Sequence, residues 1–179
     1  VQKGFVAKAH LAGVEFVNIS PLAADMPDTV KADWLAIRPN TDTALILGLC
    51  YTLLDEGLQD SDFLVRCCVG FDSFAAYLRG TDDGCAKSAD WAAAICGLPA
   101  DDIRDLARRM ARTRTMISLS WSLTRQAHGE QPMWAGIALA AMLGQIGMPG
   151  GGIGIGYSAV NRVGYDLNRV SFASFPQGI

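Results

Sequence analysis

Apolar and polar positions follow two different periods along this chain, and the period changes from one segment to the next. Residues 2–12 place Phe5, Ala9 and Ala12 at helical spacing, and a glycine closes the segment. Residues 14–19 then alternate apolar and polar side chains with the period of a β-strand. The opening of the chain is therefore predicted to be a helix that feeds a parallel strand.

The same periods predict the elements that follow. Two further strands are predicted at residues 34–37 and 115–120, where short runs are rich in β-forming residues. Residues 20–27 form a loop after the first strand, at the end of a strand where doubly wound sheets bind ligands. Helical spacing and capping residues predict helices at 43–56, 61–68, 71–78, 88–95, 103–112 and 132–143.

Strands that alternate with helices in this way are typical of an α/β fold. We predict three layers around a doubly wound, mostly parallel sheet, as in Rossmann-like nucleotide-binding domains, over residues 1–156. Because the chain opens on a helix, we expect this sheet to be incomplete and the chain to be a piece of a larger enzyme. Residues 157–179 lack a clear period and are interpreted as an extended C-terminal arm.

The amino-acid composition of the chain limits the kinds of partner that it is expected to bind. A chain of 179 residues that is 50% apolar can bury one substantial core. Its net charge is −3 and its Lys and Arg residues are scattered, so no broad basic face for nucleic acid is predicted. The longest nearly apolar stretch, 134–148, is shorter than the ~20 residues that a membrane-crossing helix needs. We expect neither a nucleic-acid partner nor membrane insertion.

Five cysteines form an odd set without Cys-x-x-Cys spacing. Cys50, Cys67 and Cys96 lie in apolar surroundings, which predicts free thiols that are buried as small apolar side chains. A zinc centre needs four ligands in close register, and the chain has only two histidines to contribute. We therefore expect no metal site formed by this chain alone.

Seven glycines fall within residues 144–156. A dinucleotide-binding glycine motif follows a strand and opens a helix, whereas this run follows the helix predicted at 132–143. We interpret the run as the end of that helix and a tight crossing of the chain. A functional contact through the glycine backbone is the alternative.

Polar residues follow two of the predicted strands. Asn40, Thr41 and Asp42 lie where a strand turns into a helix, so backbone N–H groups there favour an anion, and a carboxylate can accept two N–H bonds from a guanine edge. The alternative is that Thr41 and Asp42 cap their helix. Ser20, followed by Pro21, either binds a ribose hydroxyl or a phosphate or forms an ordinary Ser-Pro turn.

A third group follows the strand predicted at 115–120. Trp121 and Arg125 are four residues apart, which places them on one face if the segment is helical. The alternative is a core tryptophan and a surface arginine. His128 and Glu130 have the chemistry of an acid–base pair, but we favour a role for Glu130 and Gln131 in capping the next helix and bracing the loop.

Three segments, in this order, resemble the molybdopterin oxidoreductases. Residues 33–45 follow the family's Ile-Arg-Pro-Gly-Thr-Asp pattern, residues 120–131 its Trp-Ser-Leu-Gln-Arg and His-Gly-Glu-Gln runs, and residues 139–152 its Leu-Gly-Gln-Ile-Gly-Leu-Pro-Gly-Gly-Gly stretch. The chain is most similar to the dimethyl sulfoxide, trimethylamine N-oxide and biotin sulfoxide reductase group. It has Asn40 where the family has Gly, and since Asn tolerates positive φ, we expect the turn to survive. Thr124 replaces the usual Gln.

The resemblance implies a bis(molybdopterin guanine dinucleotide) molybdenum cofactor. It also implies that Trp121 shapes the pocket near molybdenum and that Arg125 contacts the cofactor or polarises the S=O or N=O oxygen, a task suited to the N–H donors of a guanidinium. The protein ligand of the metal, a serine in this group, lies outside these residues. The loop at Ser20 lacks the Asp and Arg that the family usually carries there. The cofactor-binding residues implied are Ser20, Pro21, Asn40, Thr41, Asp42, Trp121, Arg125 and His128.

The implied function is part of a bacterial molybdenum oxidoreductase that reduces S-oxides or N-oxides by oxygen-atom transfer. Its expected partners are the remaining domains of the parent reductase and a small oxide substrate, and the isolated chain should be inactive. The alternatives are a stand-alone, non-catalytic nucleotide-binding or interaction domain and a folded remnant without a ligand. The electron donor and the compartment, periplasm or cytoplasm, stay open.

Overall fold

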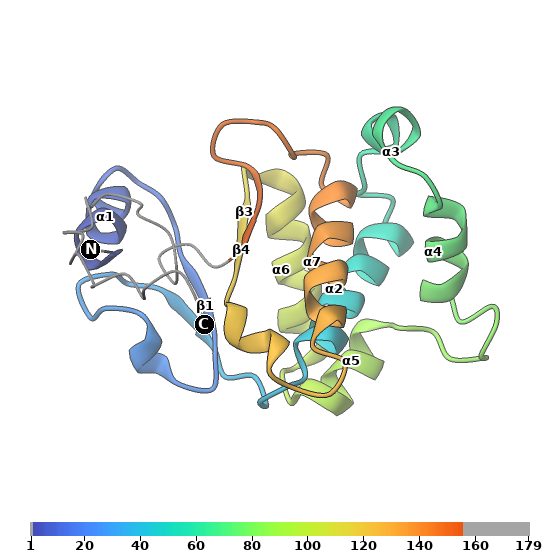
Figure 1. The fold of residues 1–179 in the computed structure, drawn as a ribbon, viewed down its shortest axis with the longest axis horizontal. Coiled ribbons are helices and arrows are strands. Elements are labelled where there is room, and N and C mark those ends of the chain that lie inside the picture. Colours follow the sequence, from blue (N-terminus) through green and yellow to red (C-terminus); the bar gives the residue numbers. More distant parts are fainter. Residues whose placement is uncertain (1, 156–179) are drawn as a thin grey trace, which may run out of the picture.

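The chain folds into a mixed α/β structure with short parallel strands and many helices (Figure 1), and the computed structural model describes residues 2–155. The coarse α/β prediction is therefore confirmed. The arm predicted at residues 157–179 lies outside the described residues. In chain order the elements are α1 (Gln2–Leu11), β1 (Val17–Ile19), the 3-10 helix η1 (Ala23–Asp25), β2 (Asp33–Leu35), α2 (Asp42–Asp55), α3 (Ser61–Cys67), α4 (Phe71–Leu78), α5 (Ala89–Cys96), α6 (Ala100–Arg112), β3 (Met116–Leu119), the 3-10 helix η2 (Trp121–Thr124), α7 (Glu130–Met142) and β4 (Gly152–Ile155).

The strands form two parallel pairs. β1 pairs with β2, with Asn18 opposite Trp34, and β3 pairs with β4, with Ile117 opposite Ile153. Within the described residues these are separate two-stranded sheets. The predicted arrangement, three layers around one continuous sheet, is therefore not observed. β1 is also shorter than the strand predicted at residues 14–19.

β4 corrects the interpretation of the glycine run. Residues 152–155 form a strand rather than only a tight crossing, with the two glycines buried and Ile153 and Ile155 half-buried. The alternation of glycine with isoleucine has the period of a strand. Because glycine has no side chain, it counts as neither apolar nor polar. An analysis of apolar and polar positions therefore misses this alternation.

The core surrounds α2. This helix packs against α5, α6 and α7 (Figure 1), and Leu45, Cys50 and Leu53 are almost fully buried in the contacts. A helix that is apolar on most of its sides is stable only when other elements cover it. At Gly48 an added Cβ would lie 2.6 Å from the Cβ of Ala92, so α2 and α5 touch almost backbone to backbone.

Gln145 extends the ladder between β3 and β4 with its side chain. Its Oε1 accepts from the N–H of Thr115 at 2.7 Å, and its Nε2 donates to the C=O of Thr113 at 2.8 Å. A residue of a parallel strand bonds in this way to the residues on either side of its partner. Gly152 donates to the C=O of Thr115 at 3.1 Å, so the amide takes the position that Gly150 would hold in a longer β4.

Arg109 of α6 ties the helical part to the first pair of strands. Its guanidinium donates to Asp33 at 2.6 Å and to Glu15 at 2.8 Å. These hydrogen bonds, with Asp33 first, hold the pKa of Arg109 above its usual value. The ion pairs place the β1–β2 pair beside α6.

The cysteine prediction holds for two of its three residues. Cys50 and Cys96 are buried, and burial raises the pKa of the Cys50 thiol above its usual range. Cys67 is exposed, because α3 turns Leu64 rather than its last residue towards the core. In residues 2–155 no helix is long and apolar enough to cross a membrane, and no three His, Cys, Asp or Glu residues gather as metal ligands would.

Candidate functional site

The turn between β2 and α2 carries the first motif. Asn40 adopts a φ of 63°, in the left-handed region, so the expectation that this asparagine keeps the turn of the family's glycine is confirmed. Thr41 is the N-cap of α2 by position, yet its hydroxyl donates to the C=O of Arg38 at 2.7 Å and does not accept an N–H of the helix. The alternative in which the side chain of Thr41 caps α2 therefore does not hold.

Valine at position 40 should destabilise the protein, whereas glycine should not. A branched side chain in the left-handed region costs about 1–2 kcal/mol, and glycine adopts this conformation freely. We expect Asn40→Val to lower the free energy of unfolding by about that amount in urea denaturation. Because Asn40 is exposed, burial does not complicate the comparison. Equal stability of the Val and Gly variants would show that the turn does not need the left-handed conformation.

Asp42 opens α2 at the end of this turn. Its carboxylate is partly buried, and burial raises its pKa by more than the hydrogen bond from its own backbone N–H lowers it. The charged carboxylate of Asp42 is therefore less well solvated in this chain than it would be in water. An N–H donor that reached this carboxylate would recover the lost solvation, as a pair of donors on a guanine edge does.

Ser20 and Pro21 form a tightly bonded loop after β1. The hydroxyl of Ser20, which is 7% exposed, donates to the carboxylate of Asp25 and accepts from the N–H of Leu22 at 3.1 Å. The C=O of Ser20 accepts from the indole N–H of Trp34 at 2.8 Å. These contacts favour the turn alternative for Ser20. A role of Ser20 and of the exposed Pro21 in cofactor binding stays a prediction.

Trp121 and Arg125 lie on an exposed segment after β3. Trp121 is 46% exposed and Arg125 is exposed too, so the core alternative for the tryptophan does not hold. The segment is a 3-10 helix in which the N–H of Arg125 donates to the C=O of Ser122 at 3.0 Å. With about three residues per turn, a spacing of four does not place two side chains on one face. That part of the prediction is wrong.

The rest of this loop folds back on itself. Gly129 is buried against Thr124, and an added Cβ would lie 2.4 Å from the backbone oxygen of Thr124. His128 has a φ of 58°, and its side chain is 84% exposed. Its Nδ1 lies 3.9 Å from Oε1 of Glu130, too far for a hydrogen bond, so the acid–base pair is not formed. α7 begins at Glu130, two residues before the predicted start, so Glu130 and Gln131 lie within the helix rather than capping it.

The three loops share a place in the fold. Each follows the carboxyl end of a parallel strand, and in Figure 1 all three leave β1, β2 and β3 at the lower end of the view. Among the residues described, the non-glycine residues with positive φ are Asn40 and His128, one in each of two motif loops. Strained backbone of this kind gathers at functional sites. The geometry therefore marks this end of the strands as the candidate site.

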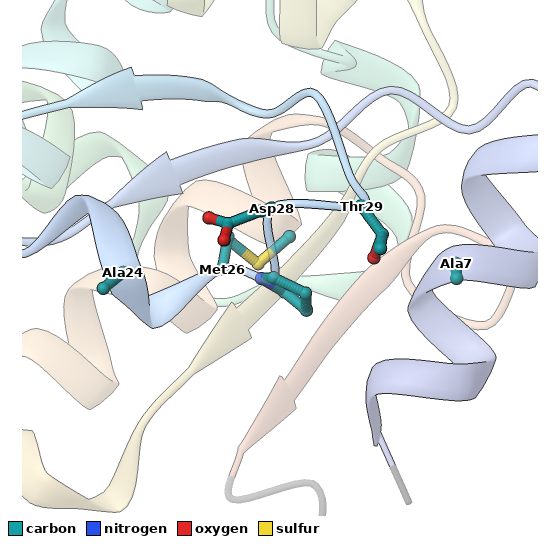
Figure 2. Close-up of a pocket in the computed structure, with 6 residues that line it drawn as sticks. Ala7, Ala24, Met26, Asp28 and Thr29 are labelled. Atoms are coloured by element: carbon teal, nitrogen blue, oxygen red, sulfur yellow. The ribbon is translucent and has the colours of Figure 1, made fainter.

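A surface cavity lies elsewhere. It has a volume of about 500 Å³, is open to solvent, and lies between α1 and the loop that follows β1 (Figure 2). None of the predicted site residues lines it, and Asp28 is its one ionisable side chain. We assign it no role. The lining residues are Ala7, Ala24, Met26, Pro27, Asp28 and Thr29.

Comparison with known proteins identifies the family. A family model described as molybdopterin oxidoreductase matches residues 3–173. The chain is 56% identical over 152 residues to a biotin sulfoxide reductase of Cereibacter sphaeroides, a match that covers 85% of this chain and 20% of that protein. It is 50% identical to a dimethyl sulfoxide/trimethylamine N-oxide reductase of the same organism, over 83% of this chain and 18% of that protein. The chain belongs to the molybdopterin oxidoreductase family, and the resemblance read from its motifs is confirmed.

More distant relatives agree with this assignment. A trimethylamine-N-oxide reductase of Haemophilus influenzae is 42% identical over 89% of this chain and 20% of its own length. Among solved structures, the acetylene hydratase from Pelobacter acetylenicus matches with a TM-score of 0.69 and 27% identity, over 82% of this chain and 19% of that one. The chain thus spans about a fifth of the length of the curated relatives it matches.

Proposed function

We propose that this chain is part of a molybdenum oxidoreductase that reduces S-oxides or N-oxides by oxygen-atom transfer. The observation that carries the proposal is the identity of 56% and 50% to two reductases named for such substrates, over more than four fifths of the chain. The partners are the remaining domains of the parent enzyme and a small oxide. The molybdenum of a molybdopterin guanine dinucleotide cofactor would, when bound, supply the two-electron chemistry that removes the oxygen atom.

The turn at residues 40–42 fits the guanine end of this cofactor. The carboxylate of Asp42 has two oxygens for two N–H donors, and the first turn of α2 attracts negative groups. Because the hydroxyl of Thr41 bonds back to Arg38, it leaves the helix N–H groups to another partner. Ser20 and Pro21 add the neighbouring loop, since β1 and β2 are adjacent strands.

Trp121, Arg125 and His128 fit the other part of the site. All three are exposed in this chain, on one loop at the end of β3. In the parent enzyme, the indole of Trp121 restricts the space around the substrate, and the guanidinium of Arg125 donates to the oxide oxygen. Positive charge and directed N–H donors stabilise the negative charge that grows on this oxygen as its bond breaks. The imidazole of His128 is a donor to the cofactor.

For the whole domain, residues 1–156, we propose a nucleotide-binding α/β unit in which the two strand pairs belong to one doubly wound sheet. Both pairs are parallel, and Arg109 holds the first pair beside α6. A strand from the parent chain would join the pairs. A structure of the full-length protein with the two pairs still apart would contradict this arrangement.

The guanine site is tested by Asp42→Asn. A folded-state pKa raised above its unfolded value contributes stability at low pH that is lost as pH rises through the raised pKa, so the charge of Asp42 is unfavourable at pH 7. We expect the variant to melt no earlier than wild type at pH 7. Its Kd for GDP, measured by calorimetry, should rise at least about tenfold because the charged acceptor is lost.

Asp55→Asn, at the far end of the same helix, is the matched control and should leave GDP binding unchanged. If Asp42→Asn binds GDP as tightly as wild type, the turn does not recognise guanine.

Native mass spectrometry of the protein from its source separates the reductase from the alternatives. A mass several times 19.1 kDa with bound molybdenum supports the reductase. A bare chain of 19.1 kDa would favour a stand-alone nucleotide-binding or interaction domain instead.

A further inference from the structure

Arg38 joins the turn to the end of another helix. Its backbone N–H donates to the C=O of Cys96 at 2.9 Å, and its Nη1 donates to the C=O groups of Ala94 and Ile95 at 3.0 and 3.1 Å. These carbonyls belong to the last turn of α5, where a helix has no partners of its own for them. A guanidinium at this end also opposes the negative end of the helix dipole. Arg38 therefore caps α5 from outside.

The fit around the guanidinium is close. Gly97 ends α5 with a φ of 82°, and an added Cβ there would lie 3.0 Å from Nε and 3.3 Å from Cγ of Arg38. Glycine at this position thus serves two purposes. It adopts the left-handed conformation that ends the helix, and it leaves room for the arginine side chain.

The other side of Arg38 holds the turn. Its C=O accepts the hydroxyl of Thr41 at 2.7 Å, across the left-handed Asn40. Asp42 follows directly and starts α2, which packs closely on α5 at Gly48. One residue therefore connects the end of α5, through its side chain and N–H, to the start of α2, through its C=O.

We infer that Arg38 is a positioning residue for the nucleotide-binding turn. It fixes the Asp42 carboxylate and the first N–H groups of α2 relative to α5, and its guanidinium serves the carbonyls of α5 rather than a phosphate. Groups of a binding site must be held within about 0.5 Å to act together, and a turn that contains a left-handed asparagine needs such an anchor. This inference rests on the proposed function, in which the turn binds a guanine nucleotide.

The experiment measures binding of GDP and of guanosine to the full 179-residue chain by calorimetry. For Arg38→Met we expect the Kd to rise about tenfold for both ligands, as for the loss of one or two hydrogen bonds to a charged group. Guanosine has no phosphate, so an equal effect on both ligands separates positioning from phosphate contact. Arg38→Lys keeps a charged donor near the carbonyls of α5 and should recover most of the affinity.

Arg114→Met is the matched control. Arg114 also donates to a backbone carbonyl, that of Pro149 at 2.8 Å, but it supports the glycine turn before β4. Its loss should lower the Tm and leave both Kd values unchanged. Hydrogen exchange adds a measurement without ligand, in which Arg38→Met should speed the exchange of the amides at residues 42–45.

Other outcomes count against either the inference or the proposed function. If Arg38→Met raised the Kd for GDP but not for guanosine, Arg38 would be a phosphate contact, and the inference would be overturned. Unchanged Kd values, or unchanged exchange at the start of α2, would overturn it as well. Failure of the wild-type chain to bind either ligand would instead count against the proposed function, and the exchange measurement would still decide whether Arg38 anchors the turn.

Discussion

On the proposed function, Arg125→Ala in the full-length protein is expected to lower kcat for S-oxide or N-oxide reduction about 100-fold. Loss of one well-placed donor to a developing negative charge typically has an effect of this size or larger. Arg125 is exposed at the end of β3, so its removal should leave the fold intact. The measurement is steady-state kinetics with a reduced dye as electron donor, together with the molybdenum content of each preparation.

Arg79→Ala serves as the control, because Arg79 is also an exposed arginine and lies at the end of α4, outside the motif loops. It should reduce the oxide at the wild-type rate. Arg125→Lys keeps the charge but not the fork of donors, and an intermediate rate is expected. Wild-type kinetics for Arg125→Ala at full molybdenum content would remove Arg125 from the active site.

Gly48→Val should have the largest effect on stability, a loss of about 3 kcal/mol in the free energy of unfolding. A glycine in a helix is ordinarily weaker than a residue with a side chain. Here, however, the added Cβ would meet the Cβ of Ala92 at 2.6 Å and Cγ2 of Ile103 at 3.5 Å. The Cβ of an alanine cannot rotate away, so α2 and α5 must separate. Urea denaturation gives the value.

Gly4→Val makes the same change in a helix with open space around the glycine. No atom lies within 4 Å of the Cβ added there, so this variant should be as stable as wild type. If Gly48→Val were equally well tolerated, the close crossing of α2 and α5 would not contribute to stability.

The helices could be predicted from the sequence because their signals are local. The helix at residues 71–78 was predicted with the bounds that the structure shows, and Ser88 caps the next one by accepting the N–H of Trp91. The left-handed conformation of Asn40 also followed from a local feature, an asparagine at the position of the family's glycine. Each of these features depends on side chains within a few residues.

The predictions that were wrong concern features that depend on contacts between distant segments. β4 forms because Gly152 and Gly154 pair with a strand more than thirty residues away, and the alternation within the run does not identify that partner. The loop at Trp121 becomes a 3-10 helix as Gly129 packs onto the backbone of Thr124, which its spacing does not predict. The role of Arg38 has the same origin, since its partners lie on α5.

The candidate site was predicted only in part by chemistry. The residues by themselves favoured helix capping at the turn and a surface role for Arg125, and the family resemblance reversed both interpretations. The structure shows that the hydroxyl of Thr41 does not cap α2.

The amide of Gln145 has a consequence for how β4 finds its place. A strand of alternating glycine and isoleucine specifies its alignment weakly, because a shift by two residues sets glycine on glycine and isoleucine on isoleucine again. Gln145 already occupies the next position towards the start of β3. A shift in that direction would have to expel the amide, so this side chain acts as a stop that keeps β4 from sliding.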